Sequence, residues 1–155
     1  MKVKDVMTSP VQYCAPETTL AEAAMKMWDS DCGVLPVVTR EGKVIGMITD
    51  RDICMAVTTK GRAASNISVW ETASGKLYSC SPDDDIQDVL KAMAAQKVRR
   101  LPVVNDDGEL RGIVCLNDLV LQAEEARGRK GAVLSDEDVI KTLKAISAHR
   151  VLVNA

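Results

Sequence analysis

The sequence is poor in aromatic residues and has no long apolar run. Aromatic side chains make up 3% of its 155 residues and phenylalanine is absent, so a core must be built from Val, Ile, Leu, Met and Ala. No apolar stretch approaches the roughly 18 residues that a membrane-spanning helix needs. The first residues are polar and do not lead into an apolar segment. We therefore expect a cytoplasmic chain.

Residues that hold metals or carry out nucleophilic catalysis are also scarce. His149 is the one histidine and has no Cys or His partner near it in the sequence, so we expect no metal site. There is no Gly-rich phosphate loop and no Cys/His or Ser/His pairing, so the chain is not expected to be an enzyme. The five cysteines form no C-x-x-C pair. This favours buried thiols in a reducing compartment, with a redox sensor built on Cys14, Cys80 or Cys115 as the alternative.

Neither sign of charge dominates the chain. Lys and Arg number 20 against 22 Asp and Glu, which gives a formal net charge of −2. The basic residues do not gather into a long block, so nothing indicates a nucleic-acid or membrane partner.

A repeat with a period of 66 residues runs through most of the chain. It appears as prolines, glycines and an aspartate that recur in the same order, Pro16, Pro36, Gly42, Gly46 and Asp52 at Pro82, Pro102, Gly108, Gly112 and Asp118. Residues 3–53 match residues 69–119 without a gap. Turn and core positions that recur in one order indicate a duplicated structural unit.

Each copy has the pattern strand, helix, strand, strand, helix. In the first copy, Thr18 or Thr19 is suited to cap a helix with one apolar face. Residues 34–38 and 44–48 are short β-branched runs joined by a turn, which predicts a hairpin, and Gly61 can end the second helix. The predicted fold class is α+β, with two copies packed in pseudo-twofold symmetry and an additional C-terminal helix.

The doubled unit, the x-x-Leu-Pro-Val-Val strand and the Gly-x-x-Thr-x-x-Asp element from Gly46 to Asp52 resemble the tandem CBS domain. The resemblance covers residues 1 to about 125 and is closest to short stand-alone bacterial CBS-domain proteins. The expected organisation is one CBS repeat at residues 1–62, a second at 66–125, and an amphipathic helix at 132–151 after a basic linker.

The resemblance implies a regulatory module that binds AMP, ADP, ATP or a related adenosine compound in clefts between the repeats, with no cofactor required. In such modules the Thr and Asp of Gly-x-x-Thr-x-x-Asp hold ribose and phosphate. Thr49 and Asp52 match this element, whereas the second copy keeps Asp118 but has Cys115 in place of the hydroxyl. The base lies against the strands before the first helix and at x-x-Leu-Pro, which here contain Thr8, Val11, Val34, Ser74, Leu77 and Val98.

Elementary chemistry supports the same residues. A carboxylate can accept hydrogen bonds from both hydroxyls of a ribose, and a helix N-terminus favours a phosphate. Arg51 and Arg100 can add charge-assisted contacts to phosphate oxygens. Arg100 stands where the first copy has Val34, so the two clefts should differ in affinity. Thr49-x-x-Asp52 is also a capping box, which a helix could use for stability without any ligand.

The C-terminal region predicts one more helix. Ser135-x-x-Asp138 is a capping box, and the residues after it form an apolar stripe of Val139, Ile140, Leu143 and Ile146. This stripe must be buried against the chain's own repeats or against a second chain. The resemblance to CBS pairs, which often dimerise, implies a homodimer. A non-binding scaffold that dimerises or docks to an unidentified target protein is the alternative to an adenosine sensor.

Overall fold

The computed structural model describes residues 1–73, 76–126 and 134–148. The chain divides into two compact units. Unit 1 contains Met1–Ser9, Tyr78–Val103 and Gly112–Ala155, and unit 2 contains Pro10–Leu77 and Val104–Arg111. The nine N-terminal residues thus belong with the second sequence copy and not with the first.

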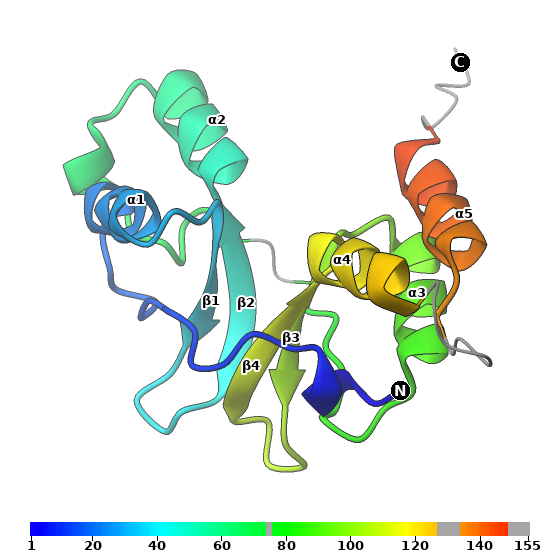
Figure 1. The fold of residues 1–155 in the computed structure, drawn as a ribbon. Helices are drawn as coiled ribbons and strands as arrows, with labels where there is room; N and C mark the ends of the chain where they lie inside the picture. Colours follow the sequence, from blue (N-terminus) through cyan, green and yellow to red (C-terminus); the bar gives the residue numbers. More distant parts are fainter. Residues whose placement is uncertain (74–75, 127–133, 149–155) are drawn as a thin grey trace. The chain divides into compact units, whose positions relative to one another are not determined.

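Unit 2 is built around the first copy. Strands β1 (Val34–Val38) and β2 (Val44–Thr49) form an antiparallel hairpin, which helices α1 (Leu20–Asp29) and α2 (Asp50–Lys60) contact (Figure 1). The short 3₁₀ helix η2 (Ala64–Asn66) follows α2 in the chain and contacts α1. Thr19 is the N-cap of α1, and Gly61 ends α2 in the left-handed conformation with φ 60°. Both capping predictions are confirmed, as is the hairpin.

The second copy repeats this plan with helices α3 (Ile86–Gln96) and α4 (Leu116–Ala126) and strands β3 (Arg100–Val104) and β4 (Leu110–Cys115). These elements belong to unit 1, except for the hairpin residues from Val104 to Arg111, which belong to unit 2. The N-terminal residues of unit 1 form the 3₁₀ helix η1 (Val3–Asp5), and its last helix is α5 (Asp136–Ser147). The capping box of Ser135 and Asp138 that was predicted for α5 is present. The α+β class is confirmed.

The 66-residue period recurs in the backbone hydrogen bonds. The N–H of Cys14 donates to the carbonyl of Pro36 at 3.0 Å, and the N–H of Cys80 donates to that of Pro102 at 3.1 Å. These contacts belong to the segment that was expected to form the first strand of each copy. It contributes a single parallel bridge in each copy, Cys14 to Val37 and Cys80 to Val103, so each sheet has two strands and not three.

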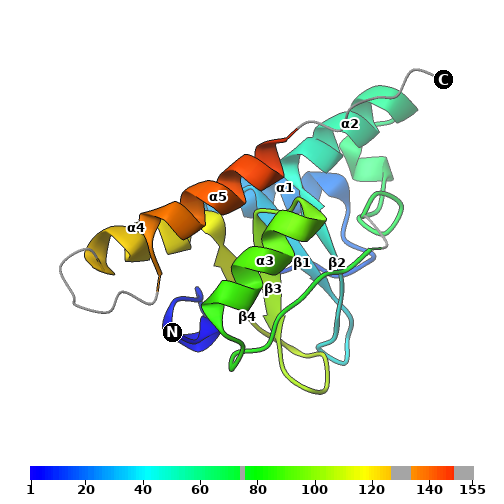
Figure 2. The same ribbon diagram turned by 90° about the vertical axis from the view of Figure 1, so that its right-hand side faces the viewer.

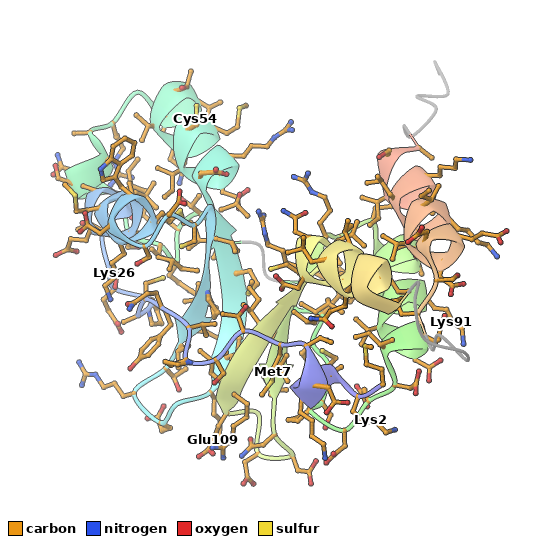
Figure 3. The ribbon with its side chains drawn as sticks, viewed as in Figure 1. Lys2, Met7, Lys26, Cys54, Lys91 and Glu109 are labelled. Carbon is orange, nitrogen blue, oxygen red and sulfur yellow. The ribbon has the colours of Figure 1, made fainter. Side chains whose placement is uncertain are left out.

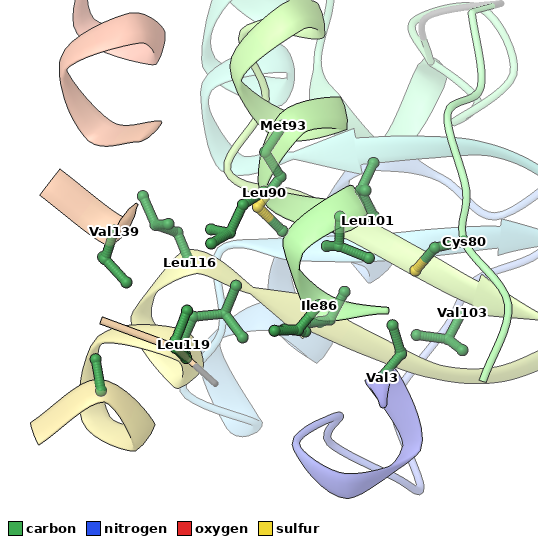
Figure 4. Packing of buried hydrophobic residues seen from close by; sticks show 14 residues of the cluster. Val3, Cys80, Ile86, Leu90, Met93, Leu101, Val103, Leu116, Leu119 and Val139 are labelled. Carbon is green, nitrogen blue, oxygen red and sulfur yellow. The ribbon is translucent and has the colours of Figure 1, made fainter. Parts of the chain in front are cut away.

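Each unit has its own apolar core, and each core is completed by a segment from outside its sequence copy. In unit 2, Ile67 and Val69 are fully buried among the side chains of α1 and β1. In unit 1, Val3 is fully buried beside Ile86 and Val103 (Figure 4). Burial of a large aliphatic side chain stabilises the folded state by about 1.5–3 kcal/mol, so these segments contribute to the stability of the unit whose core they complete.

Helix α5 packs against α3 and α4 of unit 1 (Figure 2). Leu134 and Val139 are buried, and Ile146 packs against the same core, so this part of the stripe is covered by the chain's own unit. The remaining stripe residues, Ile140 and Leu143, are 52% and 44% exposed, so the chain's own unit covers only part of the stripe and burial of the rest against a second chain stays a prediction. Within its own chain, α5 contacts the core of unit 1 through only one edge of the stripe.

Candidate functional site

In unit 2 the candidate site lies where β2 ends and α2 begins. Thr49 is the N-cap of α2, and Asp52 is its third residue. Thr49 Oγ1 donates to Asp52 Oδ2 at 2.7 Å, the N–H of Thr49 donates to the same oxygen at 2.9 Å, and the N–H of Asp52 donates to Thr49 Oγ1 at 3.1 Å. The capping box is therefore complete, and Oδ2 of Asp52 accepts both hydrogen bonds that Thr49 donates.

The other residues predicted for this site are spread along unit 2. Val34 pairs with Thr49 across the hairpin, and its side chain is buried, with 8% of its surface exposed. Arg51 is exposed on the first turn of α2. Val11 and Leu77 are half-buried in segments without regular structure. Ser74 lies outside the described residues.

Unit 1 has an equivalent junction between β4 and α4. The N–H of Cys115 donates to Asp118 Oδ2 at 3.0 Å, which reproduces the backbone part of the capping box. The hydroxyl part is absent because residue 115 carries a thiol. Asp118 thus interacts with residue 115 through its backbone N–H and its thiol, whereas Asp52 accepts from the backbone N–H and the hydroxyl of Thr49.

Arg100 lies against the same thiol. Burial first and the Asp118 carboxylate second raise the pKa of Cys115, the Arg100 guanidinium lowers it, and the pKa lies at about 11. The structure therefore brings Arg100, Cys115 and Asp118 to one place at the start of α4. Half-buried Val98 packs against the core of unit 1 at the approach to β3.

Thr8 joins this group through the backbone. Its N–H donates to the carbonyl of Ile113 at 2.9 Å, and the N–H of Ile113 donates back at 3.1 Å. Ile113 precedes Cys115 by two positions on β4, so Thr8 is fixed beside the junction of β4 and α4. Of the predicted residues, Thr8, Arg100 and Asp118 therefore share unit 1, and Val34, Thr49 and Asp52 share unit 2.

Sequence reasoning missed the reason for Gly112. A β-carbon there would come within 2.7 Å of the Thr8 carbonyl oxygen and 3.0 Å of Met7 Sδ. Glycine at this position lets the segment of Met7 and Thr8 approach β4. The signal was present as a repeated glycine, but its partner was far away in the sequence.

The thiols of Cys14 and Cys80 are poorly suited to redox chemistry. Burial raises the pKa of Cys14 to about 11 and that of Cys80 to about 12. The thiolate is the reactive form, so these side chains are largely unreactive near neutral pH. Cys14 and Cys80 are buried as expected, whereas Cys54 is exposed on α2.

No group of three or more His, Cys, Asp or Glu side chains in residues 1–73, 76–126 and 134–148 could hold a metal ion. His149 falls outside that part of the chain. Over the same described ranges, no helix has both the length and the apolar character needed to cross a bilayer.

Comparisons with known proteins agree with this architecture. The chain is 37% identical over 136 residues to the uncharacterized protein YlbB of Bacillus subtilis, which covers 87% of this chain and 90% of that protein. A crystal structure of Hypoxic Response Protein I with two coordinated zinc ions has a TM-score of 0.72 at 30% identity, covering 78% of this chain and 98% of that one.

A second solved structure is the CBS domain pair of protein MJ0100 in complex with 5′-methylthioadenosine and S-adenosyl-L-methionine. It has a TM-score of 0.71 at 25% identity and covers 78% of this chain and 94% of that one. The family model described as the CBS domain matches twice, at residues 3–59 and 69–124. This chain therefore belongs to the CBS domain family, with two CBS domains in tandem.

Proposed function

We propose that this chain is a regulatory module that binds an adenosine-containing ligand such as AMP, ADP or ATP and catalyses no reaction itself. The observation that carries the proposal is a carboxylate, Asp52 or Asp118, at the strand-to-helix junction of each copy. A carboxylate suits the two hydroxyls of a ribose, and the free N–H groups of a helix N-terminus suit a phosphate. The related CBS pair of MJ0100 is described in complex with two adenosine derivatives.

In unit 1, Arg100 is the residue that we propose to contact a phosphate of the ligand. Arg100 is half-buried beside Cys115 and Asp118, and a guanidinium held in place in this way makes stronger bonds to phosphate oxygens than a mobile one. Thr8 lies next to this group along β4. We propose that the ribose binds Asp118, the phosphate binds Arg100, and the base contacts the segments of Thr8 and Val98.

The residues of unit 2 support a second, different binding position. Asp52 has one oxygen committed to the capping box, which leaves the other oxygen for a ribose hydroxyl. Arg51 is the cation at this helix start, and buried Val34 replaces the arginine of the other copy. We propose that Thr49, Asp52, Arg51, Val11, Val34, Ser74 and Leu77 contribute here. Affinity is expected to be lower because Val34 offers no charge to a phosphate.

We further propose that the protein acts in the cytoplasm as a homodimer and signals to a target protein. Support for a homodimer comes from Ile140 and Leu143, which leave part of the α5 stripe exposed. Ligand binding would then shift the population between two arrangements of the module. Sedimentation of the protein with and without ligand tests the oligomeric state.

Thermal-shift titration with AMP, ADP, ATP, NAD and S-adenosylmethionine tests the binding proposal. A ligand present at 100 times its dissociation constant stabilises a protein by about 2.7 kcal/mol, which is readily measured. Asp118→Ala is expected to remove most of the shift and Asp52→Asn a smaller part, while Asp106→Ala in an exposed turn should leave it unchanged. The asparagine retains an acceptor for Thr49, so the helix cap is not lost with the charge.

A flat response to all five compounds would contradict the proposal. The remaining function would then be a structural or interaction scaffold, in which Thr49 and Asp52 serve only to cap α2. A shift that survives Asp118→Ala and Asp52→Asn together would place the ligand away from both junctions.

A further inference from the structure

The two strand-to-helix junctions differ in the backbone N–H groups that they leave for a ligand. At the start of α2, the N–H of Asp50 donates to the carbonyl of Gly33 at 3.2 Å, and that of Arg51 donates to Asp50 Oδ1 at 2.7 Å. The N–H of Asp52 donates to Thr49 Oγ1 at 3.1 Å. The first three N–H groups of α2 are therefore all bonded within the chain.

The N–H groups at the start of α4 are bonded differently. The N–H of Leu116 donates to the carbonyl of Arg99 at 2.9 Å. Among the residues that the structure describes, the N–H groups of Asn117 and Asp118 have no acceptor. The side chain of Leu116 has no oxygen to accept the first, and Cys115 has no hydroxyl to accept the second. Both groups therefore remain for a ligand at the positive end of α4.

Unit 1 also places cations at this junction. Arg99 and Arg100 lead into β3, and the carbonyl of Arg99 is bonded to the first turn of α4. Arg100 is half-buried and interacts with the Cys115 thiol. Arg99, Arg100 and Asp118 together carry one net positive charge. A guanidinium beside free N–H groups of a helix N-terminus suits a phosphate.

Unit 2 has a carboxylate where unit 1 has an apolar side chain. Asp50 occupies the position of Leu116, and Gly33 occupies that of Arg99. The two replacements are coupled, because a β-carbon on Gly33 would come within 2.8 Å of Asp50 Oδ2. A side chain at residue 33 would thus require the Asp50 carboxylate to move. Unit 2 therefore lacks the cation at this position and has an anion beside it.

The first turn of α2 has a net negative charge. It contains Asp50, Arg51 and Asp52, of which Arg51 is exposed. A phosphate at this helix start would meet two carboxylates and N–H groups that already have acceptors. A neutral group avoids this repulsion, and a positively charged group is attracted by the same carboxylates.

We propose that the two junctions bind adenosine compounds of different charge. The junction of unit 1 binds a compound with a phosphate at its 5′ position through Arg100 and the N–H groups of Asn117 and Asp118. The junction of unit 2 binds a compound whose 5′ group is neutral or positively charged, and Asp50 selects against the phosphate. This inference rests on the proposed function, in which Asp118 and Asp52 hold the ribose.

Three adenosine compounds that differ only at the 5′ position test the inference. AMP carries a phosphate there, adenosine a hydroxyl, and 5′-amino-5′-deoxyadenosine an ammonium group. Isothermal titration calorimetry measures their dissociation constants with the full-length protein. Asp52→Asn weakens the ribose contact of unit 2, so that protein reports on unit 1. Asp118→Asn reports on unit 2 in the same way.

The two proteins are expected to prefer opposite charges. The Asp52→Asn protein should bind AMP about tenfold more tightly than adenosine. Adding Arg100→Val, which reproduces the residue of unit 2, should remove this preference. The Asp118→Asn protein should bind the ammonium compound about tenfold more tightly than AMP.

Two substitutions of Asp50 separate its charge from its hydrogen bond. Asp50→Asn removes the charge and keeps an acceptor for the N–H of Arg51, whereas Asp50→Leu also frees that N–H and reproduces the residue of unit 1. In the Asp118→Asn protein, AMP affinity should rise about threefold with Asp50→Asn and about tenfold with Asp50→Leu. A gain in affinity cannot result from misfolding. Glu41→Gln, in the exposed hairpin turn of unit 2, removes a negative charge away from the junction and should change nothing.

The possible failures of this inference and of the proposed function can be told apart. AMP and adenosine binding equally well to both the Asp52→Asn and Asp118→Asn proteins would overturn the inference and leave the proposed function standing. An Asp118→Asn protein that binds none of the compounds, or that gains no AMP affinity from Asp50→Leu, would also overturn it. If the wild type binds none of the three compounds, the proposed function fails and the inference fails with it.

Discussion

The carbonyl oxygen of Thr8 lies where a β-carbon on Gly112 would come within 2.7 Å of it. The oxygen belongs to the backbone and accepts the N–H of Ile113, so it has little freedom to move. The absence of a side chain at Gly112 therefore allows the backbone of Thr8, which is distant in the sequence, to pack against β4 near Cys115.

Gly112→Ala is expected to destabilise the protein by about 2 kcal/mol, because the methyl group must displace the backbone of Thr8. Urea unfolding measures this change. The exposed position Asn117 provides a control, since Asn117→Ala should alter stability little. A Gly112→Ala protein as stable as the wild type would contradict the close approach.

Acid should weaken the contact between the end of α2 and the segment that follows. The Ser68 N–H and the Arg62 guanidinium lower the pKa of Glu71 from 4.5 to about 2. A carboxyl whose folded pKa lies below its unfolded value stabilises the fold above the unfolded value, and this contribution is lost as pH falls. We expect Glu71→Gln to remove the part of the acid destabilisation that occurs between about pH 4.5 and 2.

Unfolding measured between pH 7 and pH 2 tests this expectation for Glu71. The wild type and Glu71→Gln should converge in stability at the acid end and differ at pH 7. Curves that stay parallel over the whole range would show that Glu71 titrates normally. Glu17, an exposed glutamate for which no ion pair is described, allows the matched control Glu17→Gln.

The five thiols should differ widely in reactivity. Cys54 is exposed on α2 (Figure 3), whereas burial raises the pKa of Cys14, Cys80 and Cys115 to about 11 or 12. Maleimide labelling at pH 7 followed by peptide mapping should find Cys54 labelled well before these three. Labelling of unfolded protein gives the reference rates. Cys115 reacting as fast as Cys54 would restore the redox-sensor hypothesis.

Helix α5 should contribute to stability through one edge only. Val139→Ala is expected to cost about 2 kcal/mol, because Val139 is 4% exposed and packs beside Leu116 in the core of unit 1. Ile140→Ala, at the neighbouring residue that is 52% exposed, should cost far less. The comparison is made at a protein concentration that keeps the chain monomeric, where equal losses in the two variants would contradict the contact through one edge. A cost of Ile140→Ala that appears only at higher concentration supports the proposed homodimer.

The helices and hairpins could be predicted because their signals are local. Thr19 caps α1 through contacts with Glu22 in the first turn, and Gly61 ends α2 through its own backbone conformation. The first strand of each copy was expected from the pattern but forms a single bridge. Pro16 and Pro82 follow the bridged cysteine by two residues in the two copies and have no N–H to donate, which limits further pairing on that side.

The candidate site was predictable only in part for a related reason. Thr49 and Asp52 are three residues apart, so their capping box could be read directly from the sequence. The pairing of Thr8 with Ile113 and the contact of Arg100 with Cys115 depend on tertiary packing. The repeat revealed which positions correspond, but it did not show that Met1–Ser9 joins the second copy.

That arrangement of the N-terminal segment determines when each unit can fold during synthesis. Unit 2 can bury Ile67 and Val69 soon after the first copy leaves the ribosome, because nearly all of its core precedes residue 77. Val3 must wait until Ile86 and Val103 have been made. The earliest residues of the chain are thus among the last to find their partners, and unit 2 is expected to form first on the ribosome.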